Sequence, residues 1–281
     1  MLATNQQKEF KEGIFKNIDI EDYHKSQGIS SSGIKLLLNS PKKYHYQYLS
    51  GLYIHKDKKA MVAGTALHLL VLEPSLFEKT FYVMKDKIDR RTTVGKEAYA
   101  KALEECGNRK VLTLDEFNEI SSMAYAVKSN KPFVNAISKN GNIEDSIYFQ
   151  DECGALLRAR PDFYNDFLII DIKTTRDASP EGFQRSVLEY GYHIQAAMQQ
   201  DALRKTTGRE YKHFCHLVVE DEAPYLTGFY RLDDYAIDLG RAEYKRGAQT
   251  YKKCLEFDDW PGYDENIQTI SLPDWYLRRQ Q

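Results

Sequence analysis

The sequence predicts an α/β protein in which helices pack around a central mixed sheet, with a mainly helical N-terminal half. Three observations support this fold class. Apolar residues recur at helical spacing through much of residues 29–139. Alternating or continuously apolar segments of strand length begin at about residue 140. Capped helices lie between and after those strands, which is typical of helices packed on a sheet.

The domain organisation follows from length and composition. With 281 residues, 42% of them hydrophobic, the chain is long enough to bury a full core. We expect a polar lead-in over residues 1–28 and a single domain over residues 29–281. That domain divides into a mainly helical part (29–139), an α/β core (140–255) and an irregular acidic and aromatic tail (256–281).

The net charge and the spacing of the cysteines argue against several classes of protein and of metal site. A formal net charge of −2 rules out a uniform basic coat for nucleic acid, so a polyanion site must be local. No apolar run is long enough to span a membrane and no secretory signal begins the chain, so we expect a cytoplasmic protein without membrane contact. No C-x-x-C pair occurs, which argues against a zinc knuckle or an iron–sulfur cluster. We expect reduced thiols at the four cysteines Cys106, Cys153, Cys215 and Cys254.

The first half is predicted to contain five helices. Caps, prolines and apolar stripes place them at Ser30–Ser40, Pro41–Gly51, Ala60–Leu72, Glu97–Leu103 and Asp115–Lys131. The helix over Ala60–Leu72 is apolar on nearly all sides, and we expect Gly64 to allow a close backbone approach there. Two basic segments, Lys35–Lys59 and Lys85–Lys96, are either solvated surface or phosphate-contacting patches. We expect the second to be an exposed loop.

The second half is predicted to alternate strands and helices. The expected strands are Ile143–Gln150, Ala155–Arg160, Phe167–Ile172, Tyr211–Val219 and Pro224–Arg231. The expected helices begin at Ser179-Pro180, run from Tyr192 to Thr207 after a break at Gly191, and cover Asp233–Leu255.

The segment from Arg158 to Thr175 carries the most informative chemistry. Asp162 follows an Arg-Pro corner, and Asp171 and Lys173 stand two residues apart in an apolar strand, so their side chains share one face. Charged groups in such a strand are costly to desolvate without a partner. A surface ion pair is one interpretation. The other is a site for Mg²⁺ and a phosphate, because carboxylate oxygens are the ligands that Mg²⁺ prefers.

Three further residues are candidates for the same site. His68 is either a satisfied core histidine or a functional one, depending on whether another motif provides a partner. Glu144 shares a predicted strand face with Ser146 and could reach the site of Asp162. Gln195 lies one helical turn before Gln199 on one helix face.

Five short motifs occur in a fixed order along the chain. They are Gly64-Thr65-Ala66-Leu67-His68, Glu144-Asp145-Ser146, Arg158-Ala159-Arg160-Pro161-Asp162, Asp171-Ile172-Lys173-Thr174-Thr175 and Tyr192-His193-Ile194-Gln195. In this order the chain resembles the RecE-type exonucleases (the exonuclease VIII nuclease domain) of the PD-(D/E)XK nuclease superfamily. The resemblance covers about residues 23–205, and the combination is more specific than any single motif.

The resemblance implies a restriction-endonuclease-like core and a role for each matching residue. Asp162 and Asp171 would bind the metal, together with the main-chain carbonyl of Ile172, and Lys173 would be the catalytic lysine. The remaining implied site residues are His68 near the metal, Gln195 orienting the site or the phosphate, and Glu144 with a weaker claim. The implied cofactor is Mg²⁺, for which Mn²⁺ substitutes.

The implied activity is processive 5′→3′ digestion of linear double-stranded DNA that leaves a 3′ single-stranded tail for recombination. A ring-shaped homo-tetramer and a RecT-type single-strand annealing partner are also implied, and the two basic segments would then contact DNA. Two features depart from the family pattern. Gln199 stands where related nucleases often have tyrosine, and no second acid precedes Lys173 in the D-x-K element.

Two other functions stay open on the sequence. One is a PD-(D/E)XK nuclease of another kind, such as those with a four-cysteine iron–sulfur cluster, which the scattered cysteines disfavour. The other is a catalytically inactive module that binds DNA ends. The retained Asp162, Asp171 and Lys173 argue against it, because a binding module has no need of buried metal-binding acids.

Overall fold

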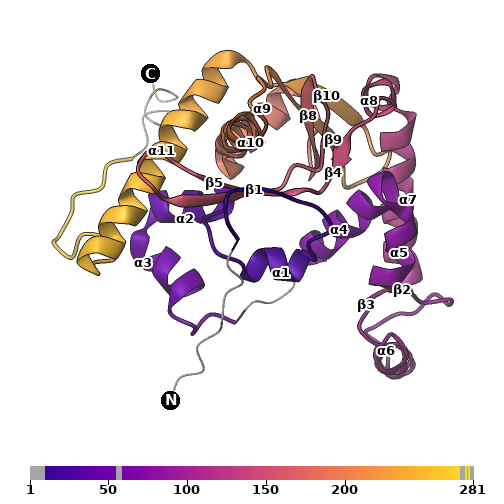
Figure 1. Cartoon of the computed structure of the whole chain (residues 1–281). Helices are drawn as coiled ribbons and strands as arrows, with labels where there is room; N and C mark the ends of the chain where they lie inside the picture. Colours follow the sequence, from indigo (N-terminus) through magenta and orange to yellow (C-terminus); the bar gives the residue numbers. More distant parts are fainter. Residues whose placement is uncertain (1–9, 55–58, 273–275, 277, 279–281) are drawn as a thin grey trace.

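A five-stranded sheet forms the centre of the molecule in the computed structural model, which describes residues 10–54, 59–272, 276 and 278 (Figure 1). Its strand order is β10-β9-β8-β7-β4. The strands are β4 (Asn142–Ile143), β7 (Phe163–Tyr164), β8 (Leu168–Thr175), β9 (His213–Glu220) and β10 (Thr227–Arg231). β8 and β9 run parallel along their whole length, and the other neighbours are antiparallel. The predicted mixed sheet is therefore confirmed.

Two smaller sheets accompany it. One joins β1 (Gly13–Phe15), β5 (Ser146–Gln150) and β6 (Leu156–Ala159), and the other is the parallel pair β2 (Phe81–Val83) and β3 (Lys110–Leu112). The strand predicted over Ile143–Gln150 is wrong as a single element. Glu144 adopts a left-handed backbone conformation with φ of 52°, which ends β4 and sends the chain into a different sheet at β5.

The helices surround these sheets. They are α1 (Ile20–Lys25), α2 (Ser31–Asn39), α3 (Pro41–Tyr44), the π-helical turn η1 (His45–Leu49), α4 (Lys59–Leu72), α5 (Pro74–Thr80), α6 (Thr93–Glu105), α7 (Leu114–Ser129), α8 (Lys131–Ile137), α9 (Pro180–Tyr190), α10 (Tyr192–Thr207) and α11 (Asp234–Phe257). All the predicted helices are present. The described part of the polar lead-in contains β1 and α1. The predicted basic loop ends before Lys96, because α6 begins at Thr93.

Local sequence explains where the helices begin. Ser30, Thr113 and Ser179 each accept a hydrogen bond from a backbone N–H of the first helical turn, so each caps its helix. Thr113 and Glu116 form a reciprocal capping box. Gly191, in the left-handed conformation, ends α9 and begins α10.

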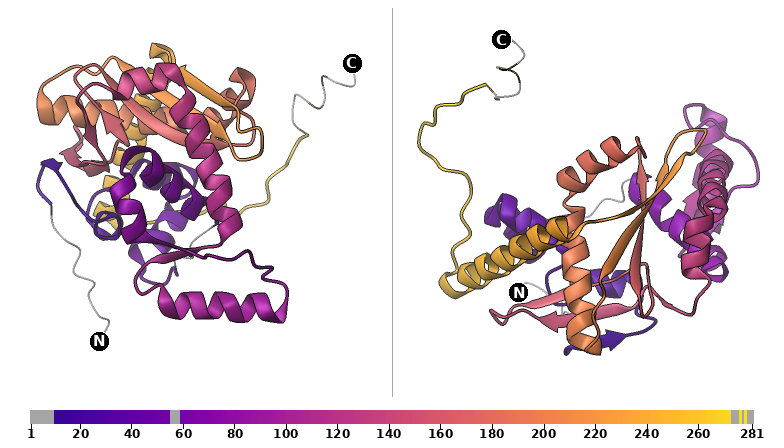
Figure 2. Two further views of the ribbon diagram at one scale, coloured as in Figure 1. Left: turned by 90° about the vertical axis from the view of Figure 1, so that its right-hand side faces the viewer. Right: turned by 90° about the horizontal axis from the view of Figure 1, so that it is seen from above.

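The central sheet lies between two helical layers, which Figure 2 shows most clearly from above. Alternation along β8 directs Ile170 and Ile172 to the layer containing α4 and α7, whereas Ile169 faces the layer of α2, α10 and α11. Burial of the two apolar faces stabilises this arrangement. β8 consequently sits in the middle of the core, with Asp171 buried and the polar residues that follow Ile172 half-buried.

α4 differs from the prediction in one respect. Its inner side is buried at Ala66, Leu67 and Val71, but Met61 is 58% exposed and Thr65 is also exposed. A Cβ atom at Gly64 would meet no other atom within 4 Å. The expectation of a close backbone approach at Gly64 is therefore wrong for the residues that the structure describes.

The C-terminal tail leaves α11 and is anchored by aromatic contacts before it extends away from the body (Figure 2). Trp260 packs against Tyr44 and Tyr251, while Trp275 lies outside the described residues. Cys106 and Cys254 are buried, the other two cysteines are half-buried and all four are free thiols. Within the described ranges, none of the helices is both long enough and apolar enough to span a membrane.

Candidate active site

Asp171 and Lys173 form the centre of the site on β8. Asp171 is completely buried, and its Oδ2 atom lies 2.6 Å from Nζ of Lys173. The contact lacks hydrogen-bonding angles, so Oδ2 has an ionic partner but no hydrogen bond. Gln195 of α10 donates a 2.6 Å hydrogen bond to the other carboxylate oxygen. The predicted acid–lysine pair is thus an interior pair rather than a surface one.

The ionisation of this pair is set by competing effects. Burial disfavours the charge on Asp171, but Lys173 outweighs it and holds the pKa of the carboxyl below its usual range. Burial likewise disfavours the ammonium, yet Asp171 and Asp162 raise the pKa of Lys173 above its usual value. Both groups are therefore charged at neutral pH.

Asp162 lies beside this pair at the entrance to β7. Its Oδ2 atom accepts a 2.6 Å hydrogen bond from the backbone N–H of Ile172, which fixes the carboxylate against β8. Burial raises the pKa of Asp162 to about 7; His68 opposes the rise, and the nearby acids Asp171 and Glu144 add to it. A carboxyl group in this state would gain from a nearby cation.

His68 reaches the same point from α4. Its Nε2 atom lies 3.0 Å from the carbonyl oxygen of Ile172 and 3.5 Å from Oδ2 of Asp162. Its Nδ1 atom lies 3.7 Å from a carboxylate oxygen of Glu144. Burial disfavours the imidazolium, but Asp162 and Glu144 outweigh burial and raise the pKa of His68 to about 9. The histidine is therefore not a satisfied apolar core residue.

Glu144 joins the site for a reason other than strand alternation. Its positive φ turns the side chain out of the strand pattern, and its N–H donates to the carbonyl of Asp162 at 3.3 Å. Arg160 donates a 2.7 Å hydrogen bond to the Glu144 carboxylate and also contacts the hydroxyl of Ser146. His68 and Arg160 together hold the pKa of Glu144 below its usual range despite burial.

The donor set fits a divalent cation. Ligand atoms of His68, Glu144 and Asp162 lie within 4.8 Å of one another. The carbonyl of Ile172 adjoins them, and Asp171 keeps a buried oxygen that has no hydrogen bond. Oxygen-rich sites of this kind suit Mg²⁺ or Mn²⁺. Metal ligation by each of these residues stays a prediction.

Three site neighbours were given no role in the site by the sequence reasoning, although Lys35 belongs to the first basic segment and Tyr192 to the fifth motif. His216 of β9 pairs with Asp171 across the sheet and places Nε2 at 3.8 Å from Oδ2, with neither ring nitrogen hydrogen-bonded. Tyr192 of α10 lies under the Lys173 ammonium, 5.2 Å from ring centre to Nζ. Lys35 of α2 donates to the carbonyl of Tyr190, and burial and Lys173 lower its pKa to about 8. Each depends on which elements meet in space.

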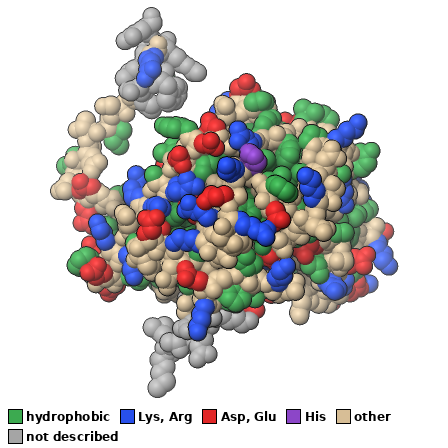
Figure 3. Space-filling view, turned by 45° about the horizontal axis from the view of Figure 1, so that its top comes forward, with side chains coloured by type: hydrophobic (Ala, Val, Ile, Leu, Met, Phe, Trp, Pro, Cys, Tyr) green, Lys and Arg blue, Asp and Glu red, His purple; other side chains and the backbone are tan. Residues whose placement is uncertain are grey.

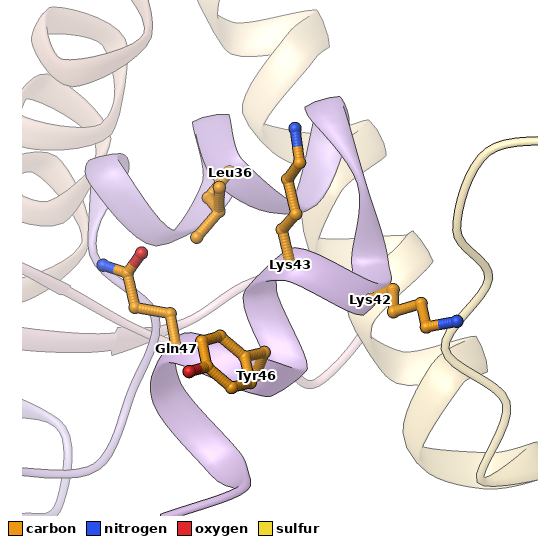
Figure 4. Close-up of a pocket in the computed structure, with 5 residues that line it drawn as sticks. All are labelled: Leu36, Lys42, Lys43, Tyr46 and Gln47. Atoms are coloured by element: carbon orange, nitrogen blue, oxygen red, sulfur yellow. The ribbon is translucent and has the colours of Figure 1, made fainter. Parts of the chain in front are cut away.

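The remaining candidates lie apart from the reacting groups. Gln199 is buried, and its side chain donates to the carbonyl of Arg160 at 3.4 Å. A surface pocket of about 370 Å³ lies in the first basic segment and includes Lys42 and Lys43 (Figure 4). Nζ of Lys43 donates a 2.5 Å hydrogen bond to the hydroxyl of Tyr263 in the tail, and the backbone N–H of Lys42 donates one to the carbonyl of Pro261. These two residues hold the tail.

Basic and acidic side chains are interspersed on the face shown in Figure 3, in agreement with the small net charge. Lys56 and Lys58 of the first basic segment fall outside the described residues. Within the described part of the second segment, Arg91 pairs with Asp89 and Lys87 pairs with Asp115. DNA contact by these segments stays a prediction.

Comparisons with known proteins bear on the family and the fold of the chain. A family model described as a PDDEXK-like domain of unknown function (DUF3799) matches residues 30–273. The crystal structure of a candidate exonuclease from Eubacterium rectale aligns with a TM-score of 0.59 at 15% identity, covering 94% of this chain and 98% of that one. At this identity the likeness concerns the fold.

Two other matches are weaker. A phage related exonuclease from Haemophilus somnus 129PT aligns over 83% of this chain and 97% of its own at 14% identity, but with a TM-score of 0.36. DNA-directed RNA polymerase subunit beta of Mycoplasmopsis pulmonis (strain UAB CTIP) is 41% identical over 71 residues, which span 25% of this chain and 6% of that protein. Neither match carries a functional argument here.

The fold, the motif order and the family model all point to the same superfamily. The predicted restriction-endonuclease-like core is confirmed, with β8 carrying the D-x-K element at its centre. By the match over residues 30–273, the chain belongs to the family of PDDEXK-like domains of unknown function (DUF3799).

Proposed function

We propose that this protein is a metal-dependent exodeoxyribonuclease that hydrolyses phosphodiester bonds of linear double-stranded DNA. The observation that carries the proposal is the convergence of Asp162, Asp171 and Lys173 on one buried point of β8, with His68 and Gln195 against it. Structural ion pairs have no need of a carboxyl whose pKa is raised to about 7 beside a second buried acid.

Each residue of the site has its own role in the proposed hydrolysis. Lys173 positions the attacking water and offsets the negative charge that develops on the phosphoryl oxygens. Gln195 keeps the Asp171 carboxylate in one orientation by its 2.6 Å hydrogen bond. His68, charged at neutral pH because of its raised pKa, favours the approach of an anionic phosphate.

Asp162, Asp171 and the Ile172 carbonyl would hold Mg²⁺, and His68 and Glu144 lie beside them. A divalent ion supplies Lewis acidity toward the phosphate and lowers the pKa of bound water. Nε2 of His68 lies close to both the Ile172 carbonyl oxygen and the Asp162 carboxylate, so the histidine would orient these two candidate ligands.

The direct test is the release of nucleotides from linear duplex DNA with Mg²⁺, and with chelator in its place. Wild-type protein should release nucleotides only with the metal, and Lys173→Ala should release almost none. Thr250→Ala on α11 alters a half-buried helical residue away from the site and serves as the matched control. Inactivity of the wild type, or equal activity of Lys173→Ala, would contradict the mechanism.

The finer features rest on the resemblance to the RecE-type exonucleases. We infer that digestion runs 5′→3′, leaves 3′ single-stranded tails for recombination and serves a RecT-type annealing protein. Release rates from duplexes labelled at the 5′ or the 3′ end test the polarity. Light scattering tests the inferred homo-tetrameric ring, for which a monomeric mass would be the contrary result. Co-purification with a RecT-type protein tests the partner.

A further inference from the structure

One face of α4 is turned away from the rest of the protein beside the candidate site. Met61, Gly64, Thr65 and His68 follow the spacing i, i+3, i+4 and i+7, so they share a face of the helix. At its outer end Met61 is 58% exposed, and Thr65 is also exposed. At its inner end His68 contacts the Ile172 carbonyl. The face therefore leads from solvent to the centre of the site.

Gly64 lies in the middle of this face, and packing does not explain it. Glycine is the least favourable residue after proline within a helix. In the described helices, each of the other glycines lacks space for a side chain, because a Cβ atom there would come within 3.0 Å of a neighbour. These glycines are Gly33, Gly95, Gly182, Gly240 and Gly247. A Cβ atom at Gly64 would meet nothing within 4 Å.

Nothing in the part of the chain that the structure describes fills the space at Gly64, which leaves it open to a ligand. Gly64 lies one turn before His68, so a ligand that reaches the site along α4 passes directly over it. Thr65 does not obstruct this path, because its hydroxyl folds back to donate to the Met61 carbonyl at 3.0 Å. None of the four residues of this face is acidic, and the acids Glu144 and Asp162 adjoin it at its inner end, where His68 pairs with both.

We propose that the Met61–Gly64–Thr65 face of α4 is a binding surface for the DNA strand whose phosphate is hydrolysed. The sugar–phosphate backbone makes its closest approach at Gly64, where the absence of a Cβ atom allows contact with the helix backbone. Met61 offers an apolar contact to a deoxyribose or a base, and the exposed Thr65 side chain, whose hydroxyl stays bonded to the helix backbone, leaves room for the strand beside it. This inference rests on the proposed nuclease function and adds the path of the substrate to it.

Two substitutions at Gly64 separate substrate contact from folding. Gly64→Ala and Gly64→Leu add side chains into open space, so both should raise the melting temperature of the full chain, by roughly 2–4 °C for alanine. Both should weaken retention of a blunt linear duplex in chelator, where no hydrolysis occurs. We expect about a tenfold loss for Gly64→Leu and a smaller one for Gly64→Ala. Ala100→Leu, on an exposed position of α6, should leave retention unchanged.

Kinetics with two substrates complete the test. With Mg²⁺, Gly64→Leu should raise KM for the duplex about tenfold and leave hydrolysis of the p-nitrophenyl ester of thymidine 5′-monophosphate unchanged, because that diester has no strand to pass over α4. Stable Gly64 variants with wild-type duplex retention and KM would overturn the proposal. A wild type without nuclease activity would refute the proposed function instead, and the retention measurement would still decide the role of Gly64.

Discussion

Lys173→Met tests whether the lysine neutralises a carboxylate that has no access to water. Asp171 is fully buried, and the lysine ammonium lies 2.6 Å from an oxygen that has no hydrogen bond. Methionine has a similar length and no charge, so packing is nearly kept. Removing one partner of a buried pair leaves an uncompensated charge and costs about 3–5 kcal/mol. We expect the free energy of unfolding to fall by that amount near neutral pH.

The stability difference between Lys173→Met and the wild type should change with pH in a defined direction. In the wild type the folded pKa of Asp171 is depressed, so its contribution to stability is present above the unfolded pKa and is lost as the pH falls. Without Lys173, burial places the folded pKa above the unfolded one, and the folded state then loses stability as the pH rises. The difference between variant and wild type should therefore be large at neutral pH and small in acid.

Urea unfolding in the presence of chelator measures both effects, at about pH 5 and about pH 8. The double variant Asp171→Asn/Lys173→Met removes both charges and should recover most of the loss, because Gln195 can hydrogen-bond an amide as well as a carboxylate. A loss below about 1 kcal/mol, an equal loss at both pH values, or a double variant as unstable as Lys173→Met would refute the reasoning.

Three further predictions concern the packing of α11, the cap of α7 and the titration of the candidate site. Gly240→Ala places a Cβ atom 2.2 Å from the His193 carbonyl oxygen, so α10 and α11 must separate and the urea midpoint should fall by the equivalent of about 1–3 kcal/mol; an unchanged midpoint would contradict the close packing. Thr113→Ala removes the capping box of α7 and should cost about 1 kcal/mol, whereas Thr250→Ala in the same assay should cost less. In chelator, stability should fall as the pH rises from about 6.5 to 8, because raised pKa values make folded Asp162 (about 7) and folded His68 (about 9) bind more protons than the unfolded chain. The lowered pKa values of His216 (about 4) and Lys35 (about 8) act in the opposite direction and offset this fall below and above that range. Mg²⁺ should flatten this slope by replacing the protons, and a pH profile that Mg²⁺ leaves unaltered would speak against the metal site.

Patterns that repeat within one element could be predicted from the sequence. β8 is apolar on both faces and carries its two polar groups on one side, so period-two alternation was enough to place Asp171 beside Lys173. α10 begins at a glycine break and ends at another glycine, which defined both of its ends. β2 and β3 have three residues each and show no period at all.

Contacts between elements that lie far apart in the sequence could not be predicted this way. His216 stands opposite Asp171 only because β9 is the parallel neighbour of β8, and no local pattern states which strands pair. Glu144 was placed at the site by strand alternation, yet it arrives there through a left-handed residue that breaks the strand. Gln195 was assigned from the family resemblance rather than from its helix period.

The residues that could be predicted and those that could not are held in the site in different ways. Asp171 and Lys173 keep their spacing because both belong to one strand enclosed by core on each side, so few changes elsewhere should alter it. His68 keeps its position relative to the Ile172 carbonyl through the packing of α4 on α7, α5 and β8, which share one core cluster. A cavity made in that interface, for example at Val127, should therefore shift His68 against the acids while leaving the acid–lysine pair intact. Core substitutions on this side of the sheet should therefore lower metal affinity at smaller perturbations than are needed to displace Lys173.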